Sequence, residues 1–461
     1  MQAVFLVGCW LSLIVLGCAA PFVMGLAYVW VDLFRPHDVY PALGQFLPFS
    51  LTTAVLTIGA YLVLDRRDPP RLGLLTALLI VWAGWITLTT TWALFAASAW
   101  WKWDWAFKTI LFTALLPFLF RSRIQMEAAL LVILCCIASN VLPFAIKSAL
   151  SGGGYGRPLG LMDNNGVWGG EGSTLSTYAF VCLPLVAYLQ RHSLLAPARG
   201  WLRWVYLAAP SIAVIGAFGT FARAALIACF VWAAVAWWQS RRKLTLGIMM
   251  VVAALAVVPL MGDAWLARIS TTLEPRQESS ANTRLLVWAW TIDLANSHPA
   301  GAGFTAYLGN RFVERDLNGQ ETVEEARAFH SIYFEVLGEH GWIGLAIFLA
   351  VFAVFFLDMR RIRRQVRGRP DLEWLGDLAR ALSHCMLIFM AGGAFIGVAF
   401  QPLQYYLFAL AVSASAALHR AAAAPAPAPA ESRVASAMLG GWRQRAGRRP
   451  CPATGASAPL R

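Results

Sequence analysis

Residues 328–345 read AFHSIYFEVLGEHGWIGL, and in them a long polar loop runs into a strongly apolar segment. A histidine at this junction, His330, can face water while the residues that follow it face lipid. Ionisable groups at membrane depth are costly, so they usually mark functional sites and have partners on other segments. The candidate partners are Arg223 and Arg284, because the guanidinium fork stays charged and matches the geometry of phosphate. The stretch therefore predicts a membrane protein with a site for a phosphate-bearing ligand.

The composition agrees with a membrane protein. Of the 461 residues, 59% are hydrophobic and only 13% are charged, and the mean hydropathy is +0.60, whereas a soluble domain has about 25% charged residues. Apolar runs near the length that a helix needs to cross a bilayer recur along the chain, and strand-like alternation is absent. The first run lacks a basic start and a cleavage site, so a retained anchor is expected. The predicted fold is an all-α polytopic helical bundle.

The net charge of +13 does not indicate nucleic acid as a partner, because the charge follows a membrane topology. Basic residues gather in every second loop, and the positive-inside rule places those loops in the cytoplasm. The loops between them, including the long loop 262–329, are then predicted to be external. The basic clusters are Arg66, Arg67 and Arg71; Arg121 and Arg123; Arg191, Arg199 and Arg203; Arg241, Arg242 and Lys243; and six arginines from Arg360 to Arg369.

Eleven spans are predicted after residue 43, and residues 1–34 add at least one more. As one helix that stretch would be about 46 Å long, too long for a hydrocarbon core of about 30 Å, and Pro21 offers a break. One bent crossing gives twelve spans with a cytoplasmic N-terminus, which is preferred, and two crossings give thirteen. The eleven segments are 44–64, 73–98, 105–120, 127–147, 172–190, 201–218, 222–239, 244–261, 331–357, 380–399 and 402–419.

The remaining segments are a tail and the external loop. Residues 420–461 hold a Pro-Ala spacer and an arginine-rich stretch, which predict a disordered cytoplasmic tail after a membrane domain of residues 1–419. In the loop, short helices are expected at 263–271 and 282–296, and together they are interpreted as a lid on the outer surface. The second has an apolar stripe and two tryptophans suited to the membrane interface. These residues are Leu285, Leu286, Trp288, Ala289, Ile292 and Trp290.

Three motifs make the sequence similar to the O-antigen ligase and polymerase superfamily, and most similar to the O-glycosylation ligases found beside exosortase systems. The likeness covers roughly residues 1–419 and stops at the tail. The motifs are GTFARAAL around Arg223, NTRLLVWAWTIDLANSHPAGAGF around Arg284 and AFHSIYFEVLGEHGWIGL around His330, supported by RPHDVY (35–40), SAWWKWDWAFKTILF (98–112) and SGGGYGRPLGLMDNN (151–165).

The resemblance implies a metal-independent, inverting transfer of a glycan from an undecaprenyl-diphosphate donor to a hydroxyl acceptor. The reaction would take place at the periplasmic face of the bacterial inner membrane, without a cofactor, and the acceptor would be a glycan, a lipid-linked saccharide core or a protein side chain. Arg223, Arg284 and His330 match, in order, the essential groups of the family. One departure is that Ala222 and Ala224 flank the first arginine, where the family usually has Ser and Gly.

Physical chemistry gives each of these residues a role and a simpler alternative. Arg223 and Arg284 would stabilise the charge that develops on the diphosphate; instead, Arg223 could snorkel at a helix end and Arg284 could pair with a loop carboxylate. His330 would accept the proton of the acceptor hydroxyl, since histidine has an unperturbed pKa of about 6.5; otherwise it only begins a helix.

Further substrate-binding candidates are less specific. Asp163 and Asn164 would line the path of the acceptor, or they form an ordinary turn. Glu339 is a candidate contact to the substrate, although a role in packing or hydrogen bonding is favoured for it and for His340. Seven cysteines lie in apolar runs and one in the tail, with no spacing that predicts a metal site or a disulfide.

Two other function classes remain open. A polysaccharide polymerase would use the same donor chemistry and differ only in its acceptor. A transporter of lipid-linked sugar would not be an enzyme, and such proteins often show internal repeats with broken helices at the midplane. No convincing repeat is found here, and the charged candidates gather at one face. A catalytic site is therefore favoured over a translocation path.

Overall fold

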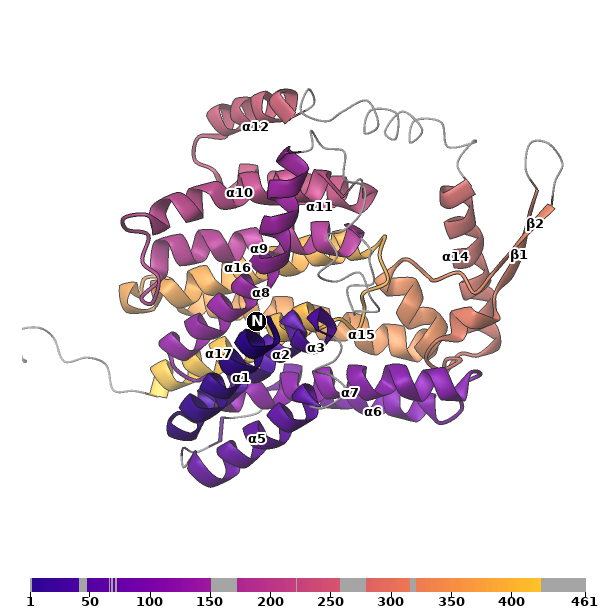
Figure 1. Ribbon diagram of the computed structural model, residues 1–461, viewed down its shortest axis with the longest axis horizontal. Helices are drawn as coiled ribbons and strands as arrows, with labels where there is room; N and C mark the ends of the chain where they lie inside the picture. Colours follow the sequence, from indigo (N-terminus) through magenta and orange to yellow (C-terminus); the bar gives the residue numbers. More distant parts are fainter. Residues whose placement is uncertain are drawn as a thin grey trace, which may run out of the picture. The chain divides into compact units, whose positions relative to one another are not determined.

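The computed structural model describes residues 2–40, 48–65, 67, 69–70, 73–150, 172–220, 222–257, 279–315 and 321–423. These residues are almost entirely helical, which confirms the predicted all-α fold (Figure 1). The helices are α1 (Gln2–Ala19), α2 (Pro21–Phe34), α3 (Pro36–Val39), α5 (Phe49–Leu64), α6 (Leu74–Thr90), α7 (Ala96–Leu119), α8 (Arg123–Leu150), α9 (Gly172–His192), α10 (Leu202–Phe218), α11 (Arg223–Gln239), α12 (Lys243–Val257), α14 (Ser279–Ser297), α15 (Ile332–Gln365), α16 (Glu373–Gly393) and α17 (Pro402–Ala423), with short 3₁₀ helices η3 (Ala306–Gly309) and η4 (Pro370–Leu372).

Many of these helices have the length and composition of membrane spans. Among the described residues, α8, α9, α15 and α17 are both long and apolar enough to cross a bilayer. Apolar segments of 10 to 17 residues occur in α1, α2, α5, α6, α10, α11 and α12. The chain is therefore a polytopic membrane protein, and the number of its crossings stays a prediction.

Residues 1–34 form a helical hairpin rather than one long helix. Ala20, which lies between α1 and α2, has an extended conformation (φ −141°, ψ 94°), and Pro21 begins α2. Trp10 and Val31 belong to one buried cluster, although a single straight helix would hold them about 32 Å apart. The structure thus confirms the break at Pro21, and the number of crossings that this segment makes stays a prediction.

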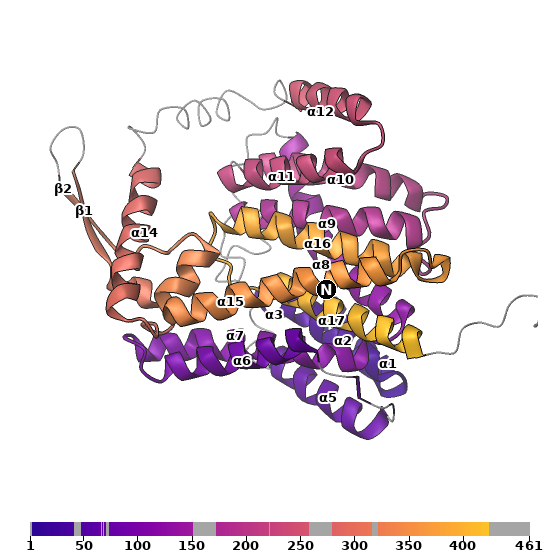
Figure 2. The ribbon, with the colours of Figure 1, turned by 180° about the vertical axis from the view of Figure 1, so that it is seen from behind.

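Helix α17 links helices that are distant in sequence. Trp82 of α6 donates a hydrogen bond to the Tyr405 hydroxyl (3.1 Å), and the Tyr406 hydroxyl donates to Asp32 of α2 (2.5 Å). Helices α6, α7, α9, α15 and α16 run in roughly the same direction in both views (Figures 1 and 2). Within this arrangement α9 packs against α8, α10, α11 and α16, and α15 packs against α6, α14 and α16.

At three helix boundaries that differ from the prediction, charged residues expected in loops lie inside helices. Helix α7 begins at Ala96, so residues 101–104, expected in a loop, lie in its first turns. Helix α15 continues to Gln365 through part of the arginine cluster, and α16 already begins at Glu373. The backbone of such extensions stays hydrogen-bonded, and their charged side chains can reach water or a buried partner.

The loop between α12 and α15 contains a β-hairpin that the sequence did not predict. Strand β1 (Arg311–Arg315) pairs antiparallel with β2 (Glu321–Glu325), and Arg311 Nε lies 3.1 Å from Glu325 Oε1 across the strands. Five-residue strands are too short for a clear alternating pattern, and this small hairpin leaves the all-α fold class unchanged. Helix α14 confirms the helix expected at 282–296. The helix expected at 263–271 lies outside the described residues.

The chain divides into two units, Met1–Ala417 and Leu418–Arg461. The described residues of the second unit are the C-terminal end of α17. Residues 424–461 lie outside the described part of the chain, so a disordered cytoplasmic tail remains a prediction.

Candidate functional site

Arg223 is the first residue of α11, and its side chain lies outside the described part of the structure. The next residue, Ala224, is only 5% exposed, where α11 packs against α9 and α16. A small residue is therefore needed after Arg223. Alanine is small enough for this position, where the resemblance led us to expect glycine. Asp163 and Asn164 lie outside the described residues.

Arg284 and His330 lie on segments that contact each other. Half-buried Arg284 is one helical turn before Trp288 on α14, and residues four apart lie on the same face of a helix. The Trp288 indole donates a hydrogen bond to the carbonyl of Phe329 (2.9 Å), and its ring stacks on Phe334 of α15 with 4.7 Å between the ring centroids. The face of α14 that carries Arg284 thus meets the segment that carries His330.

His330 is half-buried and has an unusual backbone. Its φ is +48°, a left-handed conformation that costs a non-glycine residue about 1–3 kcal/mol and persists only where the surroundings enforce it. A Cβ added at Gly397 would lie 3.8 Å from the His330 backbone nitrogen and 3.6 Å from Glu335 Oε2. The carboxylate of Glu335 and the backbone of His330 thus both lie close to Gly397, in the segment between α16 and α17.

A buried cluster of three charged side chains lies at the first turns of α15. Lys102 Nζ of α7 donates to Glu335 Oε1 (2.7 Å) and to both oxygens of Glu339 (2.8 and 2.9 Å). Glu335 is 6% exposed and Glu339 is fully buried. The backbone N–H of Thr305 donates to Glu339 (2.9 Å), and that of Ala399 donates to Glu335 (2.9 Å). One lysine side chain and two backbone N–H groups thus bind the two carboxylates. Buried charges need such partners, because they have lost their hydrogen bonds to water.

The same region of α15 contains a break at Gly341, whose φ is +69° and ψ is −172°. A Cβ there would lie 2.2 Å from the carbonyl oxygen of Pro299, so only glycine fits. The break admits residues 299–303, and Gly303 N–H donates to the Glu339 carbonyl (2.8 Å). Glycine is therefore needed at position 341 so that residues 299–303 can insert beside the break in α15. It is not needed for the close approach of two helices.

His340 belongs to the protein core. It is fully buried, its Nδ1 lies 2.7 Å from the Thr89 hydroxyl, and the rings of Trp82, Phe304 and Phe400 surround it. This environment agrees with a packing role. His330 is half-buried and lies two residues before α15, and its role as a base stays a prediction.

Lys102 is the member of the buried cluster that sequence reasoning missed. It was assigned to an external loop, although it stands in WWKWDW, where a single lysine among tryptophans indicates a partly buried charge. Two acids four residues apart in an apolar segment, Glu335 and Glu339, were the complementary signal. No group of three or more His, Cys, Asp or Glu side chains suited to a metal ion occurs in the described ranges.

We expect Lys102→Met to lower the free energy of unfolding by about 3–5 kcal/mol, because it leaves two buried carboxylates without a cation. The matched control is Lys108→Met on the same helix, whose exposed ion pair with Asp104 (2.7 Å) should contribute under about 1 kcal/mol. Unfolding of both proteins in detergent measures the difference. Equal losses in the two variants would contradict a special role for the buried cluster.

Comparison with known protein families divides the chain into two parts. Residues 1–194 match a family of unknown function, and residues 207–349 match the O-antigen ligase family. The comparison with curated proteins finds no match. The second match includes Arg223, Arg284 and His330 together with Glu335 and Glu339, and it indicates glycosyl transfer of the ligase or polymerase kind. The chain is a multi-pass membrane protein whose residues 207–349 are similar to the O-antigen ligase family.

Proposed function

We propose that this protein transfers a glycan from an undecaprenyl-diphosphate-linked donor to a hydroxyl acceptor at the periplasmic face of the inner membrane. The observation that carries the proposal is the contact between α14 and the start of α15. Through Trp288 it joins the segments of Arg284 and His330, and both residues lie within the O-antigen ligase match.

In the proposed reaction the acceptor oxygen forms a bond to the anomeric carbon while the bond from that carbon to the phosphate oxygen breaks. The diphosphate leaves with the bonding electron pair, and Arg223 and Arg284 stabilise its negative charge. The proton of the acceptor hydroxyl passes to the imidazole of His330. Attack opposite the leaving group inverts the configuration of the sugar.

The buried cluster gives this site its geometry without touching the substrate. Glu335 and the His330 backbone both lie close to Gly397, and Lys102 links Glu335 to Glu339. Glu339 was a candidate substrate contact, but its oxygens accept hydrogen bonds from Lys102 and Thr305. We therefore assign Glu339 a positioning role, and Asp163 and Asn164 stay candidates for the path of the acceptor.

Helix α14 suits a lid at the membrane surface. Its buried residues Val287, Thr291 and Ala295 recur every four positions and so form the face toward the protein. On the exposed side the helix presents apolar residues of the predicted stripe, and we propose that this side meets the lipid boundary where the polyprenyl chain of the donor enters. These residues are Leu285, Leu286 and Ile292, which are 61%, 38% and 39% exposed.

The proposed function is tested with the purified full chain, an undecaprenyl-diphosphate glycan and candidate acceptors, followed by mass analysis of the products. A ligase attaches the glycan once to an acceptor and releases undecaprenyl diphosphate. A polymerase would instead extend the lipid-linked glycan. If no new covalent product forms with any acceptor, the proposal fails and the result favours a transporter of lipid-linked sugar.

In this assay His330→Ala should fold and bind the donor but transfer the glycan about 10² to 10⁴ times more slowly, because the general base is lost. The matched control is His298→Ala, since His298 is an exposed histidine at the end of α14. A near-wild-type transfer rate in the His330 variant would show that another group accepts the proton.

Arg284→Lys should lose roughly tenfold or more in transfer rate although the charge is kept, because lysine cannot form the bidentate contact of a guanidinium with phosphate. The control is Arg311→Lys in the same loop, where an exposed ion pair should tolerate the change. Rates that fall equally in both variants, or in neither, would remove Arg284 from the diphosphate site.

A further inference from the structure

A large basic cavity lies between the connections at the end of the bundle opposite α14. Its volume is about 1120 Å³, and its lining includes eight arginines but only two carboxylates, Glu373 and Asp377. The arginines come from α9, α15, α16 and the segments that follow α11 and α15. Figure 2 shows the connection between α15 and α16 at one end and α14 at the other. This cavity is therefore separate from the proposed catalytic site.

Most of this positive charge is not neutralised by protein carboxylates. Arg380 pairs with Asp377 (3.0 Å) and Arg369 pairs with Asp371 (2.9 Å). Within the part of the chain that the structure describes, the other six arginines of the cavity form no ion pair. Like charges gathered in one cavity repel each other, so an anion bound among them would stabilise the arrangement.

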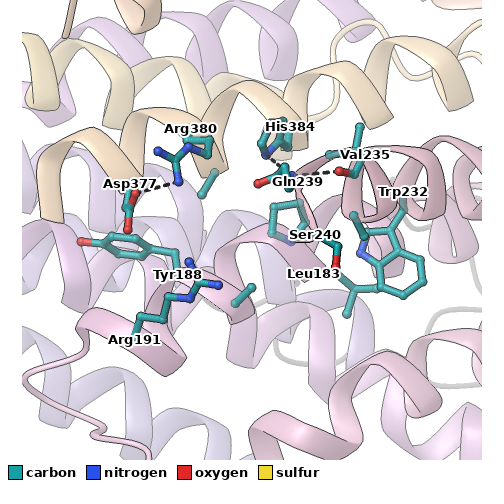
Figure 3. A pocket seen from close by; sticks show the side chains of 14 residues that line it. Leu183, Tyr188, Arg191, Trp232, Val235, Gln239, Ser240, Asp377, Arg380 and His384 are labelled. Atoms are coloured by element: carbon teal, nitrogen blue, oxygen red, sulfur yellow. Dashed lines mark hydrogen bonds and ion pairs between the residues drawn. The ribbon is translucent and has the colours of Figure 1, made fainter. Parts of the chain in front are cut away.

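An apolar groove continues from the basic cavity between α9, α11 and α16. Its volume is about 320 Å³, and it shares Arg191, Asp377 and Arg380 with the basic cavity. Figure 3 shows these charged side chains at one end of the groove and Leu183 and Trp232 at the other. The two cavities together thus offer charge at one end and an apolar slot at the other.

Aromatic residues mark the level of the membrane interface near the basic cavity. Trp238, at the end of α11, is 74% exposed, and the Lys243 ammonium lies 5.2 Å from the centre of its ring. Exposed tryptophans beside basic residues are typical of the head-group region. Arg241, which lines the basic cavity, lies between Trp238 and Lys243 in the sequence.

We propose that these two cavities bind an anionic phospholipid from the leaflet that the positive-inside rule predicts to be cytoplasmic. Its phosphate lies among the arginines and one acyl chain lies in the groove between α9, α11 and α16. Basic pockets between helices on this side of a membrane bind anionic head groups. A free phosphate would leave the groove unused. The lipid-linked donor is assigned to arginines at the other end of the protein.

The test is native mass spectrometry of the purified full chain in detergent, titrated with phosphatidylglycerol and, separately, phosphatidylcholine. We expect phosphatidylglycerol to bind more tightly, and Arg364→Gln with Arg367→Gln to weaken its binding by about 30-fold. The matched control is Arg199→Gln with Arg203→Gln, which removes the same charge from exposed positions outside the cavity and should leave affinity nearly unchanged. Equal affinity for both lipids, or equal losses in both double variants, would overturn the proposal.

A second variant tests the groove. Ala187 is exposed and lines it, so Ala187→Trp should obstruct the acyl chain and weaken phosphatidylglycerol binding by roughly tenfold. Inorganic phosphate at millimolar concentration should compete only weakly. If phosphate displaces the lipid completely while Ala187→Trp has no effect, the arginines bind a free anion and the lipid proposal is wrong.

Discussion

The buried ion cluster of Lys102, Glu335 and Glu339 is the constraint on which the His330 end of the helical bundle depends. A single ammonium contacts both carboxylates at 2.7–2.9 Å, and the amides of Thr305 and Ala399 complete the compensation. Removing one member leaves an uncompensated charge, which is far more costly than losing an exposed ion pair. The cluster therefore holds together α7, the start of α15 and two connecting segments.

The candidate catalytic residues depend on this end of the bundle in two ways. The break at Gly341 lets the loop that carries Thr305 reach Glu339, and Glu335 and the strained backbone of His330 both lie close to Gly397. On the other side, Trp288 fixes α14 to the same backbone. Arg284 lies on a helix and His330 lies in the segment that this helix contacts. Holding both in fixed positions suits a reaction that is accelerated by preorganised charge.

The sequence predicted the features that arise from local pattern and failed where distant contacts decide. Helical spans follow from apolar length, and α14 coincides with the helix expected at 282–296. The start of α7 was placed nine residues late because a lysine was assumed to need water, whereas two acids more than 230 positions away accept it. The hairpin at Pro21, the hairpin of β1 and β2 and the break at Gly341 likewise depend on packing partners. The positions of the Arg223 side chain and of Asp163 and Asn164 remain predictions.

Amide hydrogen exchange in Lys102→Met tests most directly whether the buried cluster holds the outer segments in place. At a temperature where the helices persist, the amides of residues 298–305 and 326–335 should exchange roughly tenfold faster or more than in the wild type. The reason is that the free energy of local opening falls. Exchange in α8 and α9 should stay unchanged, and Lys108→Met should match the wild type throughout. Unchanged exchange at 298–305 and 326–335 in Lys102→Met would contradict the account.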